Sequence, residues 1–166
     1  MVSLAEQLPQ EKFILAAIST VPEELYNACR DTENIHLVFD RTNDVLAYAF
    51  AGVITSGTAT LETALWNVPQ VVVYKAGSRI SFMIARMVIK VKFISLVNLI
   101  AGREVVQELI QENLTPVKLA NALSILLHDR DVRERMFLDY KEIRDLLGDE
   151  PASGRAAKLM IQYLKQ

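Results

Sequence analysis

The first stretch of the sequence that could do chemistry is a turn of small residues within positions 51–62. Ser56, Gly57 and Thr58 place two hydroxyl groups around a glycine, so the backbone can approach a ligand closely. The apolar run before this turn and the helical spacing after it predict a buried strand that leads into a helix. The first N–H groups of a helix have no acceptor within it, and phosphate is their usual external partner. We therefore expect an anion site at this turn.

Glu62 extends the expected site by one helical turn. It follows Thr58 by four residues on the same helix face, and helical side chains lean toward the N-terminus. Its carboxylate could therefore reach a sugar or ribose hydroxyl beside the phosphate. The alternative is an ordinary turn, with Thr58 as the N-cap and Glu62 as an acid favoured by the helix dipole.

A second polar turn is expected at residues 98–104, where an amide side chain, a glycine and an arginine precede a helical pattern. The Arg103 guanidinium suits a diphosphate, and the Asn98 amide suits a sugar or a base edge. Ligands of open parallel sheets bind beyond the carboxyl ends of the strands, which is where both residues are expected. The competing interpretation is that Gly102 only ends a turn and that Arg103 pairs with a local acid.

A basic segment separates these two turns. From Thr63 to Arg103 the sequence has six Lys or Arg residues and no Asp or Glu, although the whole chain has a net charge of -2. A helix is expected at 78–91, with three cations within about 40° of one another. These cations and the apolar side chains beside them suit an anionic membrane surface: Arg79, Phe82, Met83, Arg86 and Lys90. A solvated helix face, or pairing with acidic neighbours in the same fold, is the alternative.

Composition limits the remaining classes of protein. A chain of 166 residues with 51% hydrophobic content can form one well-buried domain, and its single cysteine, Cys29, fits a reducing compartment. No signal peptide and no run of about 20 apolar residues is visible, so we expect a cytoplasmic protein that does not span a membrane. His36 and His128 are isolated and Asp40 and Asp44 have the positions of turn and cap residues, so we expect no metal and no cofactor.

Short apolar runs that alternate with helical patterns predict an α/β fold, a Rossmann-like parallel sheet with helices on both faces. Strands are expected at 12–18, 35–39, the start of 51–62, 71–74 and 93–97. Before and between these strands, helices are expected at 2–8, 22–29, 45–50, the end of 51–62 and 78–91. From residue 103 onward only helices are expected, at 103–111, 115–127, 132–147 and 154–163. We expect a nucleotide-binding domain at 1–147 and a C-terminal helix within 148–166, so that an all-helical segment ends the chain.

Three motifs at consistent spacing carry a resemblance to a known family. They are ITSGTATLETAL at 54–65, VPQVVVYK at 68–75 and ISLVNLIAGREVVQELIQ at 94–111. Together they resemble the C-terminal, UDP-binding half of the lipid-A-disaccharide synthase family, and the similarity runs from about Phe13 to Leu127. The resemblance implies the second Rossmann-like domain of a glycosyltransferase B fold. It also implies an inverting, metal-independent hexosyltransferase that moves diacylglucosamine from UDP to diacylglucosamine 1-phosphate in lipid A biosynthesis.

The resemblance also assigns roles and partners. It places the diphosphate among Ser56, Gly57, Thr58 and Thr60, the ribose at Glu62, the rest of the donor pocket at Asn98 and Arg103, and the pocket mouth at Tyr74 and Lys75. The partners it implies are the UDP-diacylglucosamine donor and the anionic, cytoplasmic face of the Gram-negative inner membrane, with no nucleic acid and with a homodimer left open.

Two departures and one expected gap qualify the resemblance. The family commonly has proline where Val97 and Gln107 stand. The family's phosphate loop and its acceptor-binding N-terminal domain, which carries the acid/base residue, are expected to precede Met1. We therefore expect no catalytic residue in this chain and no activity from it alone. The other interpretations are the donor half of another UDP-GlcNAc-type transferase or epimerase, and a non-enzymatic α/β scaffold.

Overall fold

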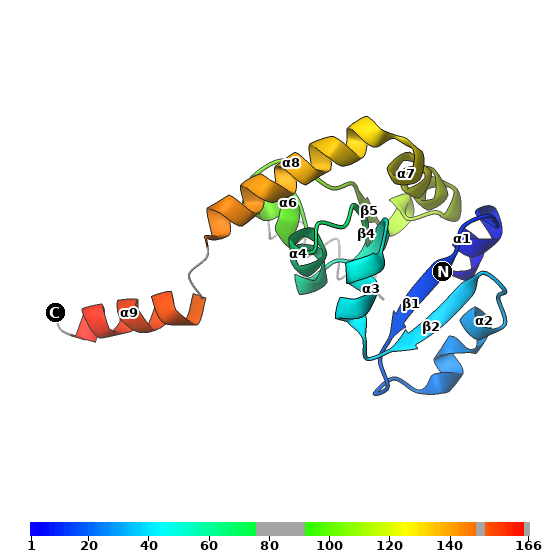
Figure 1. The fold of residues 1–166 in the computed structure, drawn as a ribbon, viewed down its shortest axis with the longest axis horizontal. Coiled ribbons are helices and arrows are strands. Elements are labelled where there is room, and N and C mark those ends of the chain that lie inside the picture. Colours follow the sequence, from blue (N-terminus) through cyan, green and yellow to red (C-terminus); the bar gives the residue numbers. More distant parts are fainter. Residues whose placement is uncertain (76–91, 149–151, 165–166) are drawn as a thin grey trace.

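Two parallel sheets form the frame of the protein in the computed structural model, which describes residues 1–75, 92–148 and 152–164 (Figure 1). In the first sheet β1 (Phe13–Ala17) pairs with β2 (Ile35–Phe39), with Phe13 opposite Ile35 and Ala17 opposite Phe39. The second sheet has the order β3-β4-β5, formed by Gly52–Thr55, Gln70–Tyr74 and Glu108–Ile110. All these pairings are parallel, so the expected α/β class with a parallel sheet arrangement is confirmed.

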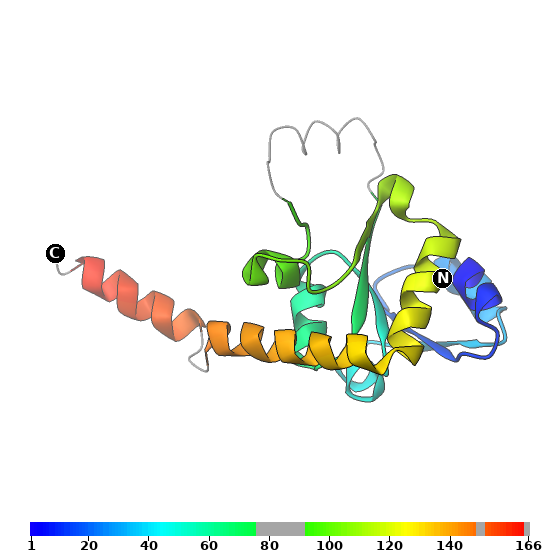
Figure 2. The ribbon, with the colours of Figure 1, turned by 90° about the horizontal axis from the view of Figure 1, so that it is seen from above.

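Helices surround these strands and continue to the end of the described chain. They are α1 (Val2–Gln7), the 3-10 turn η1 (Glu23–Tyr26) with α2 (Asn27–Arg30), α3 (Thr42–Tyr48), α4 (Thr58–Leu65), α6 (Leu96–Ala101), the 3-10 turn η2 (Gln111–Asn113), α7 (Pro116–His128), α8 (Arg130–Leu147) and α9 (Ala152–Leu164). In both ribbon views α8 runs alongside the β3-β4-β5 sheet, whereas α9 extends beyond the end of α8 and away from the strands (Figures 1 and 2). The domain division at residue 147 stays a prediction.

The main core lies where the second sheet meets the later helices. Its buried side chains include Val72 of β4, Leu109 of β5, Val97 of α6 and Ile143 of α8. Tyr140 of α8 is also fully buried there, and its hydroxyl accepts a hydrogen bond from Gln70 Nε2 at 3.2 Å. Burial raises the pKa of Tyr140, so the hydroxyl stays protonated and neutral in this core.

The two sheets are joined by side-chain packing. Among the described residues no ladder connects β1 to β3. Instead Phe13 of β1 and Val53 of β3 pack against the same small cluster, whose buried members are Leu4, Ala120 and Leu123 of α1 and α7. The first sheet is less well covered than the second, since Ile14 of β1 is 49% exposed.

The strand expected at 93–97 is wrong, because a helix begins within it. Ser95 is the N-cap of α6 and its hydroxyl accepts from the Asn98 N–H at 3.3 Å. Gly102 ends the helix with φ 67°, in the left-handed region that glycine adopts easily. The apolar run between them fits a strand and a short buried helix equally well, and the caps decide between the two.

The helix expected at 103–111 is also wrong. Residues 108–110 form β5, which pairs with β4 so that Val72 lies opposite Glu108 and Tyr74 opposite Ile110. The prediction that only helices follow Arg103 is therefore wrong, since β5 lies between α6 and α7. A strand of three residues is too short to show a period, and its pairing with a buried neighbour outweighs the helical propensity of Glu108.

The remaining expected elements are confirmed to within a few residues where the structure describes them. The strand at 35–39 has the expected bounds, and the helix expected at 45–50 begins earlier, at Thr42. α7 begins after Thr115, whose hydroxyl accepts from the Lys118 N–H at 3.3 Å. The helix expected at 78–91 lies outside the described residues.

The buried tyrosine provides a test of the core. Replacing Tyr140 by Phe removes one hydrogen bond but leaves Gln70 Nε2 bonded to the Thr60 carbonyl, so we expect a loss of about 1 kcal/mol in unfolding free energy. Tyr140→Ala opens a cavity and should cost about 3–5 kcal/mol. Leu138→Ala, on the exposed face of the same helix, should change stability by less than about 0.5 kcal/mol in urea unfolding. Equal losses for all three variants would contradict this core assignment.

Candidate functional site

The turn between β3 and α4 has the geometry of an open helix N-terminus. Gly57 is the N-cap of α4 with φ 149°, and among the described residues no side chain accepts from the first amides of the helix. That backbone conformation is one that L-residues rarely adopt, so glycine is required for conformational reasons. A Cβ built on Gly57 would meet no atom of the described residues within 4 Å, so none of them fills the space beside Gly57. The arrangement therefore presents N–H groups to the outside, as expected for an anion site.

Two hydrogen bonds of Ser56 fix this turn, one to β4 and one to the segment before α6. Its N–H donates to the Val73 carbonyl at 3.0 Å, which continues the β3–β4 pairing. Its hydroxyl donates to the Ile94 carbonyl at 3.0 Å. The single hydroxyl proton is thus used inside the protein, so Ser56 orients the turn rather than donating to a ligand.

Thr60 also acts inside the turn. It is fully buried, and its hydroxyl donates to the Gly57 carbonyl at 2.8 Å. On α4, Thr58 precedes Thr60 and Glu62 follows it, and both are exposed. The residues of this turn that face solvent are therefore Gly57, Thr58 and Glu62, and these are the ones placed to meet a ligand.

The hydrogen-bonding groups of the Asn98 side chain are all used within the protein. Its Nδ2 donates to the Val106 carbonyl and to Glu108 Oε1, both at 2.8 Å. Its Oδ1 accepts from the N–H groups of Val105 and Val106 at 2.7 and 2.9 Å. With two donors and two acceptor positions filled on a fully buried side chain, Asn98 has a structural role.

For Arg103 the structure agrees with the competing interpretation, in which Gly102 ends a turn and Arg103 pairs with acidic residues. Gly102 ends α6 in the left-handed region, and the Arg103 guanidinium bonds to two acids of α8, with Nη2 2.6 Å from Glu142 and 2.7 Å from Asp139. These hydrogen bonds, that of Glu142 first, raise the pKa of Arg103. The guanidinium is therefore directed at α8, and it would have to exchange both carboxylates for a phosphate in order to bind a diphosphate.

Glu108 is a residue of this site that the sequence did not indicate. Its carboxylate accepts from the N–H groups of Ile94 and Ser95, from the Ser95 hydroxyl and from Asn98, at 2.7–3.3 Å. It was missed because the expected helix at 103–111 makes Glu108 an ordinary surface acid. The ten-residue spacing from Asn98 has no local signature.

The ends of the other strands have simpler roles. The Asp40 carboxylate accepts from the Ser19 N–H at 3.0 Å, and this interaction with Ser19 lowers the pKa of Asp40. Asp44 pairs with Arg41 in the first turn of α3. Asp40 thus has the expected turn role, whereas neither carboxylate caps α3, whose N-cap is Arg41 and has no side-chain hydrogen bond. Tyr74 and Lys75 are exposed at the end of β4. Lys75 is the last residue of the first described range, and the next range begins at residue 92.

The membrane-facing side chains expected on the basic helix, which are Arg79, Phe82, Met83, Arg86 and Lys90, lie outside the described residues. Within the described ranges, no three His, Cys, Asp or Glu side chains gather where they could hold a metal ion. The described part of the chain also has no helix long and apolar enough to cross a membrane.

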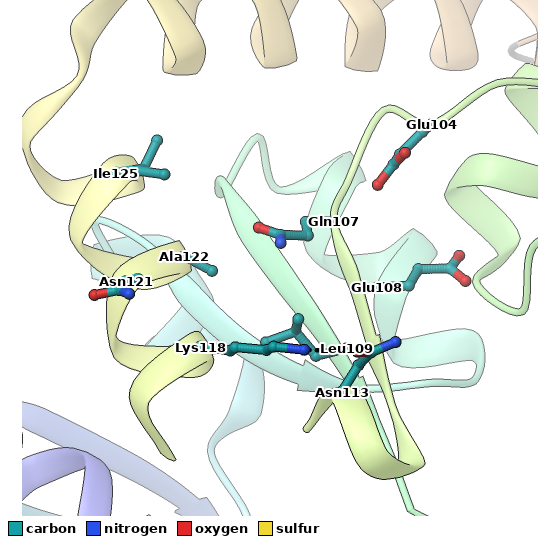
Figure 3. Close-up of a pocket in the computed structure, with 9 residues that line it drawn as sticks. All are labelled: Glu104, Gln107, Glu108, Leu109, Asn113, Lys118, Asn121, Ala122 and Ile125. Atoms are coloured by element: carbon teal, nitrogen blue, oxygen red, sulfur yellow. Dashed lines mark hydrogen bonds between the residues drawn. The ribbon is translucent and has the colours of Figure 1, made fainter. Parts of the chain in front are cut away.

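A hollow of about 410 Å³ lies beside β5 and is separate from the turn at Gly57. Its lining residues come from the segment 104–113 and from α7, and Lys118 Nζ donates to Asn113 Oδ1 at 2.7 Å across one end (Figure 3). No residue of 56–62 lines it. The open helix N-terminus and this hollow are therefore two distinct features.

Comparison with known proteins identifies one family. The model of the lipid-A-disaccharide synthetase family matches residues 1–161. Curated lipid-A-disaccharide synthases similar to this chain include those of Anaeromyxobacter dehalogenans (strain 2CP-C), 36% identical over 99% of this chain and 45% of the relative, and Syntrophus aciditrophicus (strain SB), 37% identical over 98% and 43%. That of Gluconobacter oxydans (strain 621H) is 42% identical over 75% of this chain and 31% of its own length. The chain thus spans less than half the length of these relatives.

Arg103 yields a test of the two interpretations of its turn. Because its exposed guanidinium pairs with the exposed carboxylate of Glu142 and the partly buried one of Asp139, Arg103→Gln should cost about 1 kcal/mol or less in unfolding free energy. For the same reason the variant should bind UDP within about threefold of the parent chain in calorimetry, a difference below that of one typical charged hydrogen bond. A loss of tenfold or more would restore Arg103 to the donor site. Lys141→Gln, an exposed cation on α8, is the control for the change of charge.

Proposed function

The chain belongs to the lipid-A-disaccharide synthase family, and we propose that it supplies the UDP-binding portion of such an enzyme. The proposed reaction transfers 2,3-diacylglucosamine from UDP to 2,3-diacylglucosamine 1-phosphate, with inversion and without a metal ion. The proposal rests on the family membership and on the turn between β3 and α4. Its substrates are those implied by the sequence resemblance.

The observation that carries the proposal is the open N-terminus of α4. Gly57 gives the backbone a conformation that exposes the first amides of the helix, and no side chain in the described ranges accepts from them. Amides and a helix dipole stabilise the negative charge of a diphosphate in the ground state and as a leaving group. We assign the diphosphate to these amides and to Thr58, and the ribose to Glu62.

The remaining site residues take supporting roles in this proposal. Ser56 and Thr60 hold the turn through the Ile94 and Gly57 carbonyls, and Asn98 holds the segment beside it. Tyr74 and Lys75 stand at the pocket mouth. We assign no catalytic residue to this chain, so that it binds the donor but does not catalyse transfer alone, since transfer requires an acceptor held against the donor.

Calorimetry with UDP, ADP and phosphate tests this function on the 166-residue chain. We expect UDP to bind more tightly than ADP or phosphate, and Glu62→Ala to lose about tenfold in UDP affinity because a charged hydrogen bond to the ribose is removed. The stability of this variant should fall by at most about 1 kcal/mol, the usual value of an acid near a helix N-terminus.

Glu6→Ala, which removes an exposed acid from α1, serves as the control and should leave UDP affinity unchanged. Absence of UDP binding by the parent chain would refute the proposed function. Unfolding of the Glu62→Ala variant would show that Glu62 is structural.

We further propose that the basic segment around Arg79, Arg86 and Lys90 faces the anionic inner-membrane surface. The support is the sequence, which has no acid between Thr63 and Arg103. Each cation should contribute about 1 kcal/mol of attraction to anionic lipid, which salt screens over about 10 Å. Replacing all three by Gln should therefore strongly reduce binding to anionic vesicles in a sedimentation assay, with little binding of either protein to neutral vesicles.

The control for that experiment removes the same number of charges elsewhere. Arg30, Arg41 and Arg130 are exposed partners of local ion pairs, and replacing them by Gln gives the same net charge. This control should retain most of the vesicle binding. Equal losses in the two triple variants would show that total charge, and not the basic segment, is responsible.

A further inference from the structure

One carboxylate holds the segment that precedes α6. Glu108 Oε1 accepts from the Ser95 N–H at 3.0 Å, the Ser95 hydroxyl at 2.7 Å and Asn98 Nδ2 at 2.8 Å. The Ile94 N–H donates to Oε2 at 3.0 Å and also to Oε1 at 3.3 Å. Ser95 and Asn98 are fully buried. Figure 3 shows that the carboxylate points away from α7. Four donors thus converge on one side chain at the start of β5.

The same segment reaches the turn of the proposed donor site. Ile94 is bonded on both sides of its backbone: its N–H donates to Glu108, and its carbonyl accepts from the Ser56 hydroxyl at 3.0 Å. Ser56 precedes Gly57 directly, so the position of its hydroxyl influences the direction of the first amides of α4. The path from the carboxylate to the turn therefore passes through one residue.

We infer that Glu108 is a positioning residue for the turn at Ser56–Thr58, acting through Ile94 and the Ser56 hydroxyl. This inference rests on the proposed function, in which that turn binds the UDP diphosphate. Glu108 itself does not bind the ligand, since its carboxylate is engaged by four donors and would repel a phosphate. Its effect is geometric, because binding through several short hydrogen bonds is sensitive to small displacements of the donors.

Glu108→Gln is the sharpest variant. Its remaining carbonyl oxygen can keep the bonds of Oε1, including the longer one from the Ile94 N–H at 3.3 Å, whereas its NH₂ group replaces Oε2 and cannot accept the shorter bond at 3.0 Å. The fold should therefore persist while Ile94 loses its closest acceptor. We expect UDP affinity to fall by about threefold, the lower end of the range for one hydrogen bond, because the bond is weakened and acts on the ligand only through the turn. Glu108→Ala should lose more affinity, and its stability should fall because buried donors are left without a partner.

Glu104→Gln is the matched control, since Glu104 is an exposed acid that lines the same hollow as Glu108. It should leave UDP affinity unchanged. Calorimetry is performed under conditions in which circular dichroism shows each variant to be folded. A lower affinity then does not result from unfolding of the variant. A double-mutant cycle adds Ser56→Ala: if both residues act through Ile94, Glu108→Gln should cost less in the Ser56→Ala background than in the parent chain.

A readout without ligand separates this inference from the proposed function. In ¹⁵N-labelled chain, Glu108→Gln should shift the amide resonances of Gly57 and Thr58, and Glu104→Gln should not. If the parent chain fails to bind UDP, the proposed function is wrong, while shifts at Gly57 and Thr58 still support the positioning role. Unshifted resonances at these two residues in the Glu108→Gln variant, or additive losses in the cycle, would overturn the inference.

Discussion

The fold around the candidate site depends on one polar cluster, formed by the buried Asn98 and Ser95 and the partly buried Glu108. Every hydrogen-bonding position of the Asn98 amide is used, and the Glu108 carboxylate receives donors from the same segment. A buried polar side chain is stable only when its partners are present, so this cluster requires α6 and β5 to keep one mutual arrangement. Ile94 then transmits that arrangement to Ser56, at the end of β3.

The parallel topology explains why the site lies where it does. β3 and β4 end at the same edge of their sheet, and α4 starts immediately beyond β3, so its N-terminus opens at that edge. Gly57 permits the turn and Thr60 closes it from within. The ligand-binding capacity of this edge therefore comes mainly from backbone amides, and the side chains around it chiefly fix their direction.

The sequence predicted the strands and helices whose ends carry strong local signals. The strand at 35–39 is an apolar run between turn residues, and α7 has a threonine cap followed by proline. The region 93–111 was mispredicted because its short apolar runs fit either structure, and the choice is made by pairing with β4 and by the Ser95 cap. Asn98 and Arg103 of this region were singled out, but Glu108 was not, and the partners of Asn98 and Arg103 were not identified. Those of Arg103 lie 36 and 39 residues away on α8, a distance in sequence over which no local pattern acts.

The measurement that tests the account most directly is a UDP titration of the ¹⁵N-labelled chain followed by amide resonances. If the open N-terminus of α4 binds the diphosphate, the largest shifts should occur at Gly57, Thr58 and Ala59, with smaller ones at Glu62. The amides of residues 118–125 on α7, beside the hollow at β5, should stay unchanged. Shifts centred on α7 with none at Gly57 to Ala59 would contradict the account and place the nucleotide in that hollow.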